Sequence, residues 1–337
     1  MYCMSPAILP DLRATEDAHW HRTALEQVEN YRRQFLGQAR ILREAADYQA
    51  ESKGKRLRPT ILLCFASIGQ LLPRPDPAAL RAAAAIELLH EASLIHDDVL
   101  DQSLIRRNRP SVPEKFGVST ALHLGRFMMS VSMSILAEAC EEAEAALNLD
   151  LLRVLSQAQL EECLSPHLNP TTQRQRCIRV IHGKTGSLFK LSAQVGAALS
   201  SHGAVQGAVT RAAPPFSEHL ALAFQLRDDL ADLENDTHIR KPGGNDLLRG
   251  LPTLPFQIWA ASLPQPQTAW ERLKRCRNDI TAAEDLQREI LSRGIHCEIR
   301  ETIRTELRAA RTLLSQLPVC TARNTLDTLL DHLLPAS

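Results

Sequence analysis

The sequence is poor in aromatic residues and glycine, and it carries no net charge. Aromatic residues make up 4% of the 337 residues, and there are 14 glycines. The alternation typical of β-strands is scarce while Leu, Ala, Arg, Glu and Gln are abundant, so the composition favours helices. Lys and Arg total 39, as do Asp and Glu. This balance disfavours a general nucleic-acid-binding protein, because such proteins usually carry a basic excess.

Cysteine pairs and long apolar runs are also lacking. The eight cysteines are scattered without a Cys-x-x-Cys pair, so neither a zinc site nor a disulfide framework is indicated, and we expect free thiols in a reducing compartment. The first residues lack the basic start and apolar core of a signal peptide. No uncharged apolar run of about 18 residues, the length that spans a membrane, is present. We therefore expect a cytoplasmic protein without a membrane span.

Several motifs of common enzyme classes are absent. The sequence has no Gly-x-x-x-x-Gly-Lys-Ser/Thr loop, no Gly-x-Gly-x-x-Gly, no Gly-x-Ser-x-Gly and no His-Glu-x-x-His. What remains is a helical chain whose hydrophobic content of 44% is enough for a substantial core. No linker is long or polar enough to separate domains, so we predict a single all-α domain over residues 1–337, with irregular tails at 1–16 and 332–337. The expected helical segments are 17–49, 78–101, 120–147, 151–164, 174–198, 216–233, 268–293 and 297–314.

An acidic cluster ends one of these helices. Asp97, Asp98 and Asp101 follow an apolar, alanine-rich run. Positions four apart share a helix face, so Asp97 and Asp101 point the same way, with His90 two turns earlier. Carboxylates at this end repel one another and oppose the helix dipole unless a cation lies among them, and an oxygen-only ligand set suits Mg²⁺. Alone, this cluster leaves a metal site and a solvated helix end equally open.

A second cluster repeats the pattern. Gln225, Asp228, Asp229 and Asp232 lie at spacings that place them on one face, again at the end of an apolar helix. Two copies of Asp-Asp-x-x-Asp are much more specific than one. Two facing banks of carboxylates can hold several Mg²⁺ ions around one polyphosphate.

Basic residues bracket the first cluster. The run Lys53–Arg58 contains four cations, and Arg106, Arg107 and Arg109 follow Asp101 closely. Arginine and lysine bind phosphate groups, although a charge run more often faces solvent. Cations this close to carboxylates indicate one ligand that needs both metal and direct phosphate contacts. A flexible segment that begins at Lys241 follows the second cluster and can close over bound phosphate.

Together these motifs resemble the all-trans polyprenyl diphosphate synthases. They occur in the order of that family over roughly residues 50–256. The matching pieces are Gly54-Lys-Arg-Leu-Arg-Pro59, Leu89-His90, His96-Asp-Asp-Val-Leu-Asp101, Arg106-Arg107 with Pro110, Gly183-Lys-Thr-Gly186, Phe224-Gln225 with Asp228-Asp-Leu-Ala-Asp232, and Lys241-Pro-Gly-Gly-Asn-Asp246 with Thr253-Leu-Pro255.

The resemblance implies a single helical bundle around a central cavity, which acts as a homodimeric prenyltransferase. It would join isopentenyl diphosphate to an allylic diphosphate and use Mg²⁺, with three ions once substrate is bound. The metal-binding residues it implies are Asp97, Asp101 and Asp228 as ligands, supported by Asp98, Asp229 and Asp232. Those implied for isopentenyl diphosphate are Lys55, Arg58, His90 and Arg107. The allylic site would contain Arg106 and Lys241, with Lys184, Thr185 and Gln225 as the catalytic residues.

Small side chains one turn before Asp97 indicate a long product. In the resembled family the growing chain extends beside the first acidic helix, and Ala92 and Ser93 would leave room for it. We therefore expect a product of about twenty carbons or more, which can partition into membranes. Leu89, or Met128, Met129 and Met133 on the next helix, would set the actual limit, although ordinary core packing explains the methionines as well.

Three positions depart from the family pattern. Arg126 follows Gly125 in place of Asp, Leu251 follows Gly250 in place of Lys, and Gln157-Ala158-Gln159 replaces an acidic triplet. Two rival functions remain: a class I terpene cyclase, and a non-catalytic subunit of a heteromeric synthase. The second Asp-Asp-x-x-Asp cluster counts against the cyclase. The six cluster aspartates count against the subunit, which Arg126 and Leu251 nevertheless leave open.

Overall fold

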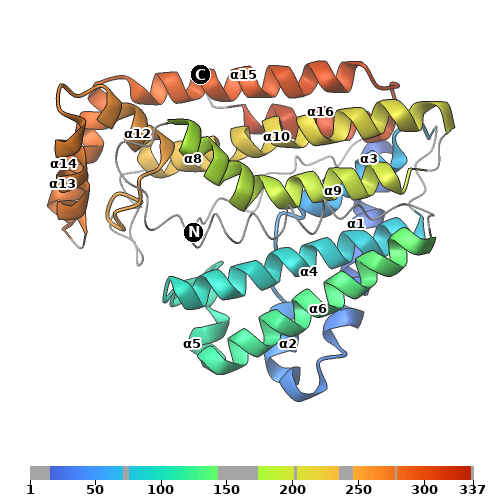
Figure 1. Cartoon of the computed structure of the whole chain (residues 1–337). Coiled ribbons are helices and arrows are strands. Elements are labelled where there is room, and N and C mark those ends of the chain that lie inside the picture. The colour runs from blue at the N-terminus through green and yellow to red at the C-terminus, as the bar shows by residue number, and fades with distance from the viewer. Residues whose placement is uncertain are drawn as a thin grey trace. The chain divides into compact units, whose positions relative to one another are not determined.

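The computed structural model describes residues 16–70, 76–142, 174–200, 203–234, 246–277 and 279–334, and their regular structure is almost entirely helical (Figure 1). The predicted all-α class is confirmed. The strands in these ranges are β1 (Ile105–Arg106) and β2 (Arg109–Pro110), which form one antiparallel hairpin. The α-helices are α1 (Glu16–Leu36), α2 (Arg43–Ala50), α3 (Leu57–Ser67), α4 (Pro77–Leu100), α5 (Val112–Phe116), α6 (Val118–Glu142), α8 (Arg174–Ile181), α9 (Ser187–Ala198), α10 (Gly203–Glu234), α12 (Leu254–Ala261), α13 (Pro266–Cys276), α14 (Ile280–Ser292), α15 (Ile295–Ser315) and α16 (Thr321–Leu333).

Helix α4 begins where the sequence places it. The side chain of Asp76 caps the helix by accepting a hydrogen bond from the amide of Ala78 at 2.7 Å, and Pro77 occupies the first turn. Both features favour a helix start, because the first amides have no partner inside the helix. The helix ends at Leu100, and Gln102 then takes a left-handed conformation with φ of 50°. These two signals fix the ends of the helix that carries the first acidic cluster.

Three helical predictions need correction. The expected helix 17–49 is interrupted at Gly37 and divides into α1, a short 3₁₀ turn (η1, Arg40–Leu42) and α2. The expected helix 268–293 divides into α13 and α14. Finally, α16 extends two residues into the predicted irregular tail 332–337. The expected helix 151–164 lies outside the described residues.

Helix α10 is longer than expected at its N-terminal side. The expected helix 216–233 begins directly after Pro214 and Pro215, yet the observed helix continues through both prolines. Each proline removes one main-chain hydrogen bond from the helix. Burial of the side chains of Val209, Ala213 and Phe216 offsets this cost in stability, because a continuous helix keeps its apolar face packed.

The chain divides into two compact units. The first contains Met1–Leu151, Leu188–Ser217 and Arg311–His332, and the second contains Leu152–Ser187, Glu218–Ala310 and Leu333–Ser337. The boundaries lie within α10 and α15. The prediction of a single domain therefore stays a prediction. No helix in the described ranges is long and apolar enough to cross a membrane.

Within the first unit, α4 lies at the centre and packs against α1, α3 and α6 (Figure 1). The approach of α6 is close because Gly125 has no side chain: a Cβ atom there would lie 2.3 Å from Nε2 of His96. In the second unit, α12 packs against α8, α13 and α14. The first acidic cluster belongs to the first unit, and the second cluster to the second unit.

Candidate active site

The first acidic cluster combines two buried carboxylates with one exposed carboxylate. Asp97 is 9% exposed and Asp98 is 2% exposed, whereas Asp101 faces solvent. Burial of a carboxylate is costly unless a cation or hydrogen-bond donor compensates it. The cluster is therefore a partly enclosed site rather than a solvated helix end.

Arg106 supplies the compensation at Asp98. Its Nε atom lies 2.9 Å from both carboxylate oxygens of Asp98, and its Nη2 atom also contacts this group. Arg106 lies on β1, and the turn after it contains Arg107 with φ of 52° and Asn108 with φ of 61°. Two consecutive positive φ angles are typical of the type I′ turn that closes two-residue hairpins. The hairpin thus places Arg106 and Arg107 in succession beside α4.

His90 lies among arginine side chains. Burial lowers the pKa of His90 well below its usual value, and the charges of Arg58 and Arg107 lower it further. The imidazole is therefore neutral at physiological pH. Burial lowers the pKa of Arg58 to about 10, and its guanidinium lies 4.8 Å from the ring centroid of Phe189. Three of the four residues predicted to bind isopentenyl diphosphate, namely Arg58, His90 and Arg107, thus share one positively charged region.

Gly54 completes this region. A Cβ atom on Gly54 would lie 2.9 Å from Nη1 of Arg56 and 3.0 Å from Nη2 of Arg107. Only glycine lets the backbone come this close to two guanidinium groups. Lys55, the fourth predicted residue, follows directly and is half-buried. The segment between α2 and α3 therefore brings backbone and cations together.

Arg56 belongs to the same basic run but turns inward. Its guanidinium contacts Glu87, Glu91 and Glu29 and is 8% exposed. Arg32 joins this group through Glu29 and Glu91. These partners of Arg56 were not predicted from the sequence. A signal was present, because Glu87 and Glu91 lie four residues apart in an otherwise apolar helical run.

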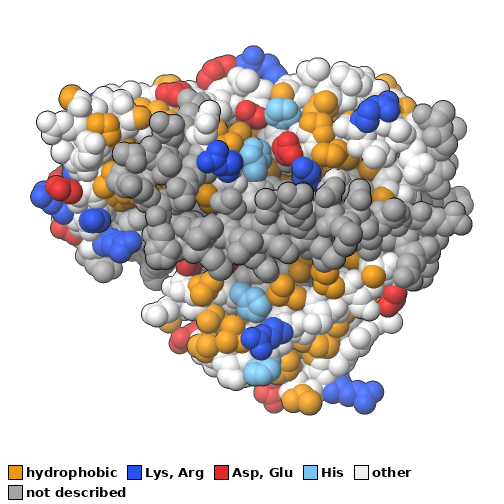
Figure 2. Space-filling model, in the orientation of Figure 1, with side chains coloured by type: hydrophobic (Ala, Val, Ile, Leu, Met, Phe, Trp, Pro, Cys, Tyr) orange, Lys and Arg blue, Asp and Glu red, His pale blue; other side chains and the backbone are white. Residues whose placement is uncertain are grey.

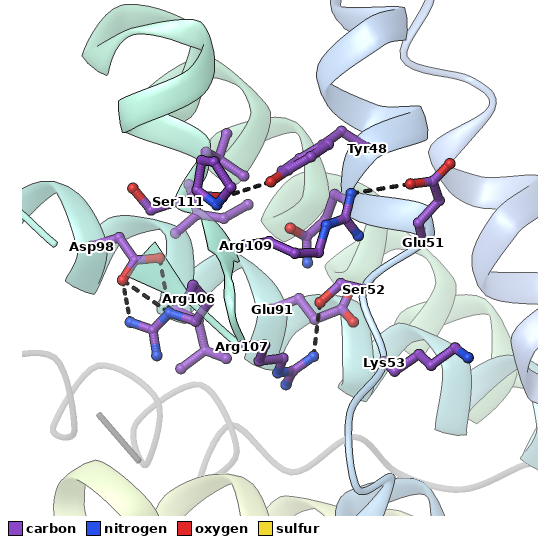
Figure 3. Close-up of a pocket in the computed structure, with 15 residues that line it drawn as sticks. Tyr48, Glu51, Ser52, Lys53, Glu91, Asp98, Arg106, Arg107, Arg109 and Ser111 are labelled. Carbon is purple, nitrogen blue, oxygen red and sulfur yellow. Dashed lines mark hydrogen bonds and ion pairs between the residues drawn. The ribbon is translucent and has the colours of Figure 1, made fainter. Parts of the chain in front are cut away.

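A cavity of about 260 Å³ lies between α2, the hairpin and α4. Figure 3 shows that hydrogen bonds and an ion pair hold the hairpin along this cavity. The hydroxyl of Tyr48 donates to the carbonyl of Pro110 at 2.7 Å, Arg109 contacts Glu51 at 3.0 Å, and Nη1 of Arg107 donates to Oγ of Ser52 at 2.9 Å. The charged residues that line the cavity are Lys53, Arg106, Arg107, Arg109, Glu51, Glu91 and Asp98. The hairpin and the 48–53 segment consequently form one cationic wall.

The second acidic cluster is crowded with carboxylates. Burial raises the pKa of Asp229 well above its usual range, and the carboxylates of Asp246, Asp228 and Asp232 raise it further. The amide of Asp246 also donates to Oδ2 of Asp232 at 2.8 Å, which holds the following turn against the cluster. Asp246 thus belongs to this site, although the sequence analysis gave it no role.

A hydrogen-bonded chain joins this cluster to the residues predicted to be catalytic. The hydroxyl of Thr185 donates to Oε1 of Gln225 at 2.8 Å, and Nε2 of Gln225 donates to Oδ1 of Asp229 at 2.9 Å. Thr185 lies in a π-helical turn (η3, His182–Gly186) with Lys184, whose side chain is exposed. Such single π turns occur often at functional sites. The turn and α10 therefore present these polar groups together.

The donor set fits a divalent metal ion. Each cluster offers carboxylate oxygens without a cysteine ligand, which is the chemistry that Mg²⁺ prefers. In the part of the chain that the structure describes, no three Asp, Glu, His or Cys side chains converge closely enough to hold an ion. A cation would relieve the repulsion that raises the pKa of Asp229 and so favour a closer arrangement.

Two of the unusual residues can be located. Arg126 is exposed on α6, and Leu251 is 37% exposed after Gly250. Gly250 has φ of 71°, and a Cβ atom there would lie 2.6 Å from Nε of Arg277. A cationic side chain therefore lies beside the turn in which Leu251 replaces lysine. Lys241 and Gln157-Ala158-Gln159 lie outside the described residues.

Residues 39–290 match the family model of polyprenyl synthetase. The chain belongs to the polyprenyl synthetase family. It is 31% identical over 296 residues to a prenyl transferase of Synechocystis sp., covering 87% of this chain and 89% of that relative. It is 30% identical to octaprenyl diphosphate synthase of Haemophilus influenzae over 210 residues, which span 62% of each chain.

The fold agrees with this assignment. The crystal structure of a decaprenyl diphosphate synthase from Rhodobacter capsulatus superposes with a TM-score of 0.81 and 26% identity, covering 96% of this chain and 98% of that one. The family resemblance, the helical fold and the class of prenyltransferase predicted from the sequence are confirmed. The role of each site residue in this polyprenyl synthetase stays a prediction.

Proposed function

We propose that this chain condenses isopentenyl diphosphate with an allylic diphosphate, releases pyrophosphate and forms an all-trans polyprenyl diphosphate. The observation that carries the proposal is the position of neutral His90 among Arg58 and Arg107, on the same helix as Asp97. The arginines can bind a diphosphate directly, while the carboxylates suit a diphosphate held through metal ions. One helix thus serves two differently bound diphosphates.

The remaining polar residues act on the allylic substrate. Arg106 and Lys184 bind its diphosphate group, together with Lys241. Removal of the diphosphate leaves an allylic cation, which the double bond of isopentenyl diphosphate attacks. Oxygen atoms of Thr185 and Gln225 stabilise this cation, and their hydrogen bond of 2.8 Å holds them in one orientation. Pyrophosphate accepts the proton that is then lost.

In this proposal Asp97, Asp101 and Asp228 ligate Mg²⁺ and the other three cluster aspartates support them, with three ions when substrate is bound. Bound Mg²⁺ stabilises the negative charge that develops on the departing diphosphate. The crowded carboxylates around Asp229 support this role, because they gain most from a divalent cation. Asp246 adds a fourth carboxylate to the second cluster.

We infer a product of about twenty carbons or more from the small side chains before the first cluster. Ala92 is fully buried and Ser93 is half-buried on α4. Met128 is fully buried, whereas Met133 is 38% exposed, so Met128 is the better candidate for a limit on α6. The names of the octaprenyl and decaprenyl synthases above are consistent with a long product.

We also propose a cytoplasmic homodimer that pairs through α6. Val118 and Met133 on this helix are 53% and 38% exposed, and Leu122 and Met129 between them are half-buried. These four residues fall on one helix face. Figure 2 shows hydrophobic side chains interspersed with histidine and basic residues on the part of the first unit where Figure 1 places α4 and α6. A second copy would cover this apolar stripe.

The decisive experiment uses purified chain, labelled isopentenyl diphosphate, several allylic primers and Mg²⁺. We expect incorporation with release of pyrophosphate, and mass spectrometry of the products gives their length. A chelator should stop the reaction, and added Mg²⁺ should restore it. No incorporation with any primer would reject catalysis by the chain alone and favour the heteromeric subunit. A cyclised hydrocarbon without isopentenyl units would instead identify a terpene cyclase.

A further inference from the structure

A closed ring of charged side chains lies behind the positively charged region. The carboxylate of Glu91 contacts Nη1 of Arg32 at 3.0 Å through Oε2 and Nη1 of Arg56 at 3.1 Å through Oε1. Glu29 bridges the same two arginines from the other side, contacting Arg32 at 2.9 Å and Nε of Arg56. Glu87 adds a contact of 2.5 Å to Arg56. Negative and positive groups therefore alternate around the ring.

The ring is buried except at Glu29, whose side chain is 27% exposed. Glu91 is completely inaccessible, while Arg32 is 1% exposed and Glu87 is 2% exposed. Burial raises the pKa of Glu91, and the guanidinium groups of Arg32 and Arg56 oppose this effect and favour its ionised form. Buried ion pairs contribute little to stability on average, because removal of the charges from water offsets their attraction. Stability alone therefore does not account for this ring.

The ring fixes the segment that joins α2 to α3. Nη2 of Arg32 donates to the carbonyl of Ala50 at 2.6 Å, and Nη2 of Arg56 donates to the carbonyl of Ser52 at 3.1 Å. Ser52 in turn accepts the hydrogen bond from Arg107 through its hydroxyl. Glu91 thus holds both arginines that determine where this segment lies.

Strain in the backbone points to the same conclusion. Arg56 has φ of 52°, a left-handed conformation that is unfavourable for a residue with a side chain. The contacts to the three glutamates hold it there, immediately after Gly54 and Lys55. Arg58 follows two residues later, and His90 directly precedes Glu91 on α4. The ring is therefore connected to every residue assigned to the isopentenyl diphosphate site.

We propose that Glu91, acting through Arg32 and Arg56, is a positioning residue for the isopentenyl diphosphate site. This inference rests on the proposed function. Glu91 does not touch the substrate; its charge keeps the Ser52–Arg58 segment and Arg107 at the spacing that one diphosphate group requires. Of the allylic residues, Thr185 and Gln225 belong to the other unit, and Arg106 pairs with Asp98, which is not a member of the ring.

The test compares Glu91→Gln and Arg32→Lys with the wild-type chain. Glutamine keeps the size of Glu91 but loses its charge. Lysine has one side-chain nitrogen in place of the three through which Arg32 reaches Glu29, Glu91 and the carbonyl of Ala50. For both variants we expect the KM for isopentenyl diphosphate to rise about tenfold, the factor expected for loss of one charge-assisted hydrogen bond. kcat and the KM for the allylic primer should stay within about twofold.

The matched control is Ile86→Val, which removes one methyl group from a fully buried side chain of α4. It should lower the thermal midpoint without changing either KM. Equal rises in both KM values for Glu91→Gln, or a pattern like that of Ile86→Val, would overturn the positioning role.

Calorimetric binding of isopentenyl diphosphate without primer separates this inference from the proposed function. Weaker binding by Glu91→Gln supports the positioning role even if the wild-type chain proves inactive. Equal affinity of the two proteins rejects the positioning role while an active wild-type chain upholds the function. No binding by the wild-type chain rejects both.

Discussion

Arg106 binds the carboxylate of Asp98 from a different element, the hairpin that follows α4. Its Nε atom is 2.9 Å from each oxygen of that carboxylate. Asp97 lies one residue earlier on α4 and faces a different side of the helix. The adjacent aspartates therefore have different surroundings, and their substitution should have different consequences.

Asp98→Asn keeps the size of the side chain but leaves Arg106 without its ionic partner. We expect the KM for the allylic diphosphate to rise about tenfold, because a displaced guanidinium loses a charge-assisted hydrogen bond to substrate. Asp97→Asn should instead raise the Mg²⁺ concentration needed for half-maximal activity. Steady-state kinetics with titrated Mg²⁺ separates the two. Asp47→Asn, at the exposed Arg43–Asp47 pair, is the control. An equal Mg²⁺ shift for both cluster variants would mean that Asp98 is a metal ligand.

Gly125→Ala should destabilise the protein. The added Cβ atom would lie 2.3 Å from Nε2 of His96, so either the imidazole ring or the two helices must shift near Asp97. We expect a loss of about 1–3 kcal/mol in the free energy of unfolding, measured with urea, together with lower activity. At Gly207 in α10, a Cβ atom would meet only the flexible Arg211 side chain at 3.4 Å. Gly207→Ala should therefore be neutral or stabilising by up to about 1 kcal/mol. Equal stabilities of the two variants would contradict the close approach at Gly125.

Acid should destabilise the fold through His21. Burial lowers the pKa of this side chain to about 4 from its ordinary 6.5, and its Nε2 atom lies 2.9 Å from Oγ1 of Thr60. Because the folded-state pKa is the lower one, the unfolded chain binds a proton first as the pH falls. Stability is therefore complete above the ordinary pKa and is lost between that value and the folded-state pKa.

As the pH falls from about 7 to about 5, titration of His21 should lower the free energy of unfolding by roughly 2 kcal/mol. His21→Gln retains a polar side chain near Thr60 but does not titrate in this range. Urea unfolding at both pH values should show a smaller loss for the variant. A loss equal to that of the wild-type chain would assign the acid sensitivity to other groups.

Ser93→Phe should shorten the product. Ser93 is half-buried on the face of α4 that also carries Asp97, so a phenyl ring there would obstruct a chain that extends along the helix. Mass analysis should show fewer isoprene units than in the wild-type product. Ile41→Phe adds a ring at a residue that is 99% exposed and should leave product length unchanged. Wild-type length in Ser93→Phe would reject α4 as the wall of the elongation path.

Met133→Glu should dissociate the proposed homodimer. Met133 is 38% exposed on the apolar stripe of α6, and a symmetric interface would bring two introduced carboxylates together. Sedimentation analysis should show a dimer for the wild-type chain and a monomer for the variant. Leu251→Glu, at another apolar side chain that is 37% exposed, should remain dimeric. If Met133→Glu also remains dimeric, the apolar stripe of α6 is not the dimer interface.

The sequence predicted features that depend on neighbouring residues. Pro77 marks the start of α4 because proline geometry acts within the first turn of a helix. The spacing of Asp228 and Asp232 gives a shared face because the helical repeat is local. At Pro214 and Pro215 the same reasoning was wrong, because it weighed the local cost of proline without the burial of Val209 and Phe216.

By itself, the sequence determined the helical class, the two acidic clusters and the basic segments, since composition and periodicity record them directly. Only the tertiary structure decided which charges face substrate and which face the interior. Arg56 and Arg58 are two residues apart in one basic run, yet Arg56 pairs with Glu87 and Glu91, 31 and 35 residues away in the sequence. Burial makes such pairing necessary, because a charge removed from water must find an opposite charge, and folding brings that partner from a distant part of the chain.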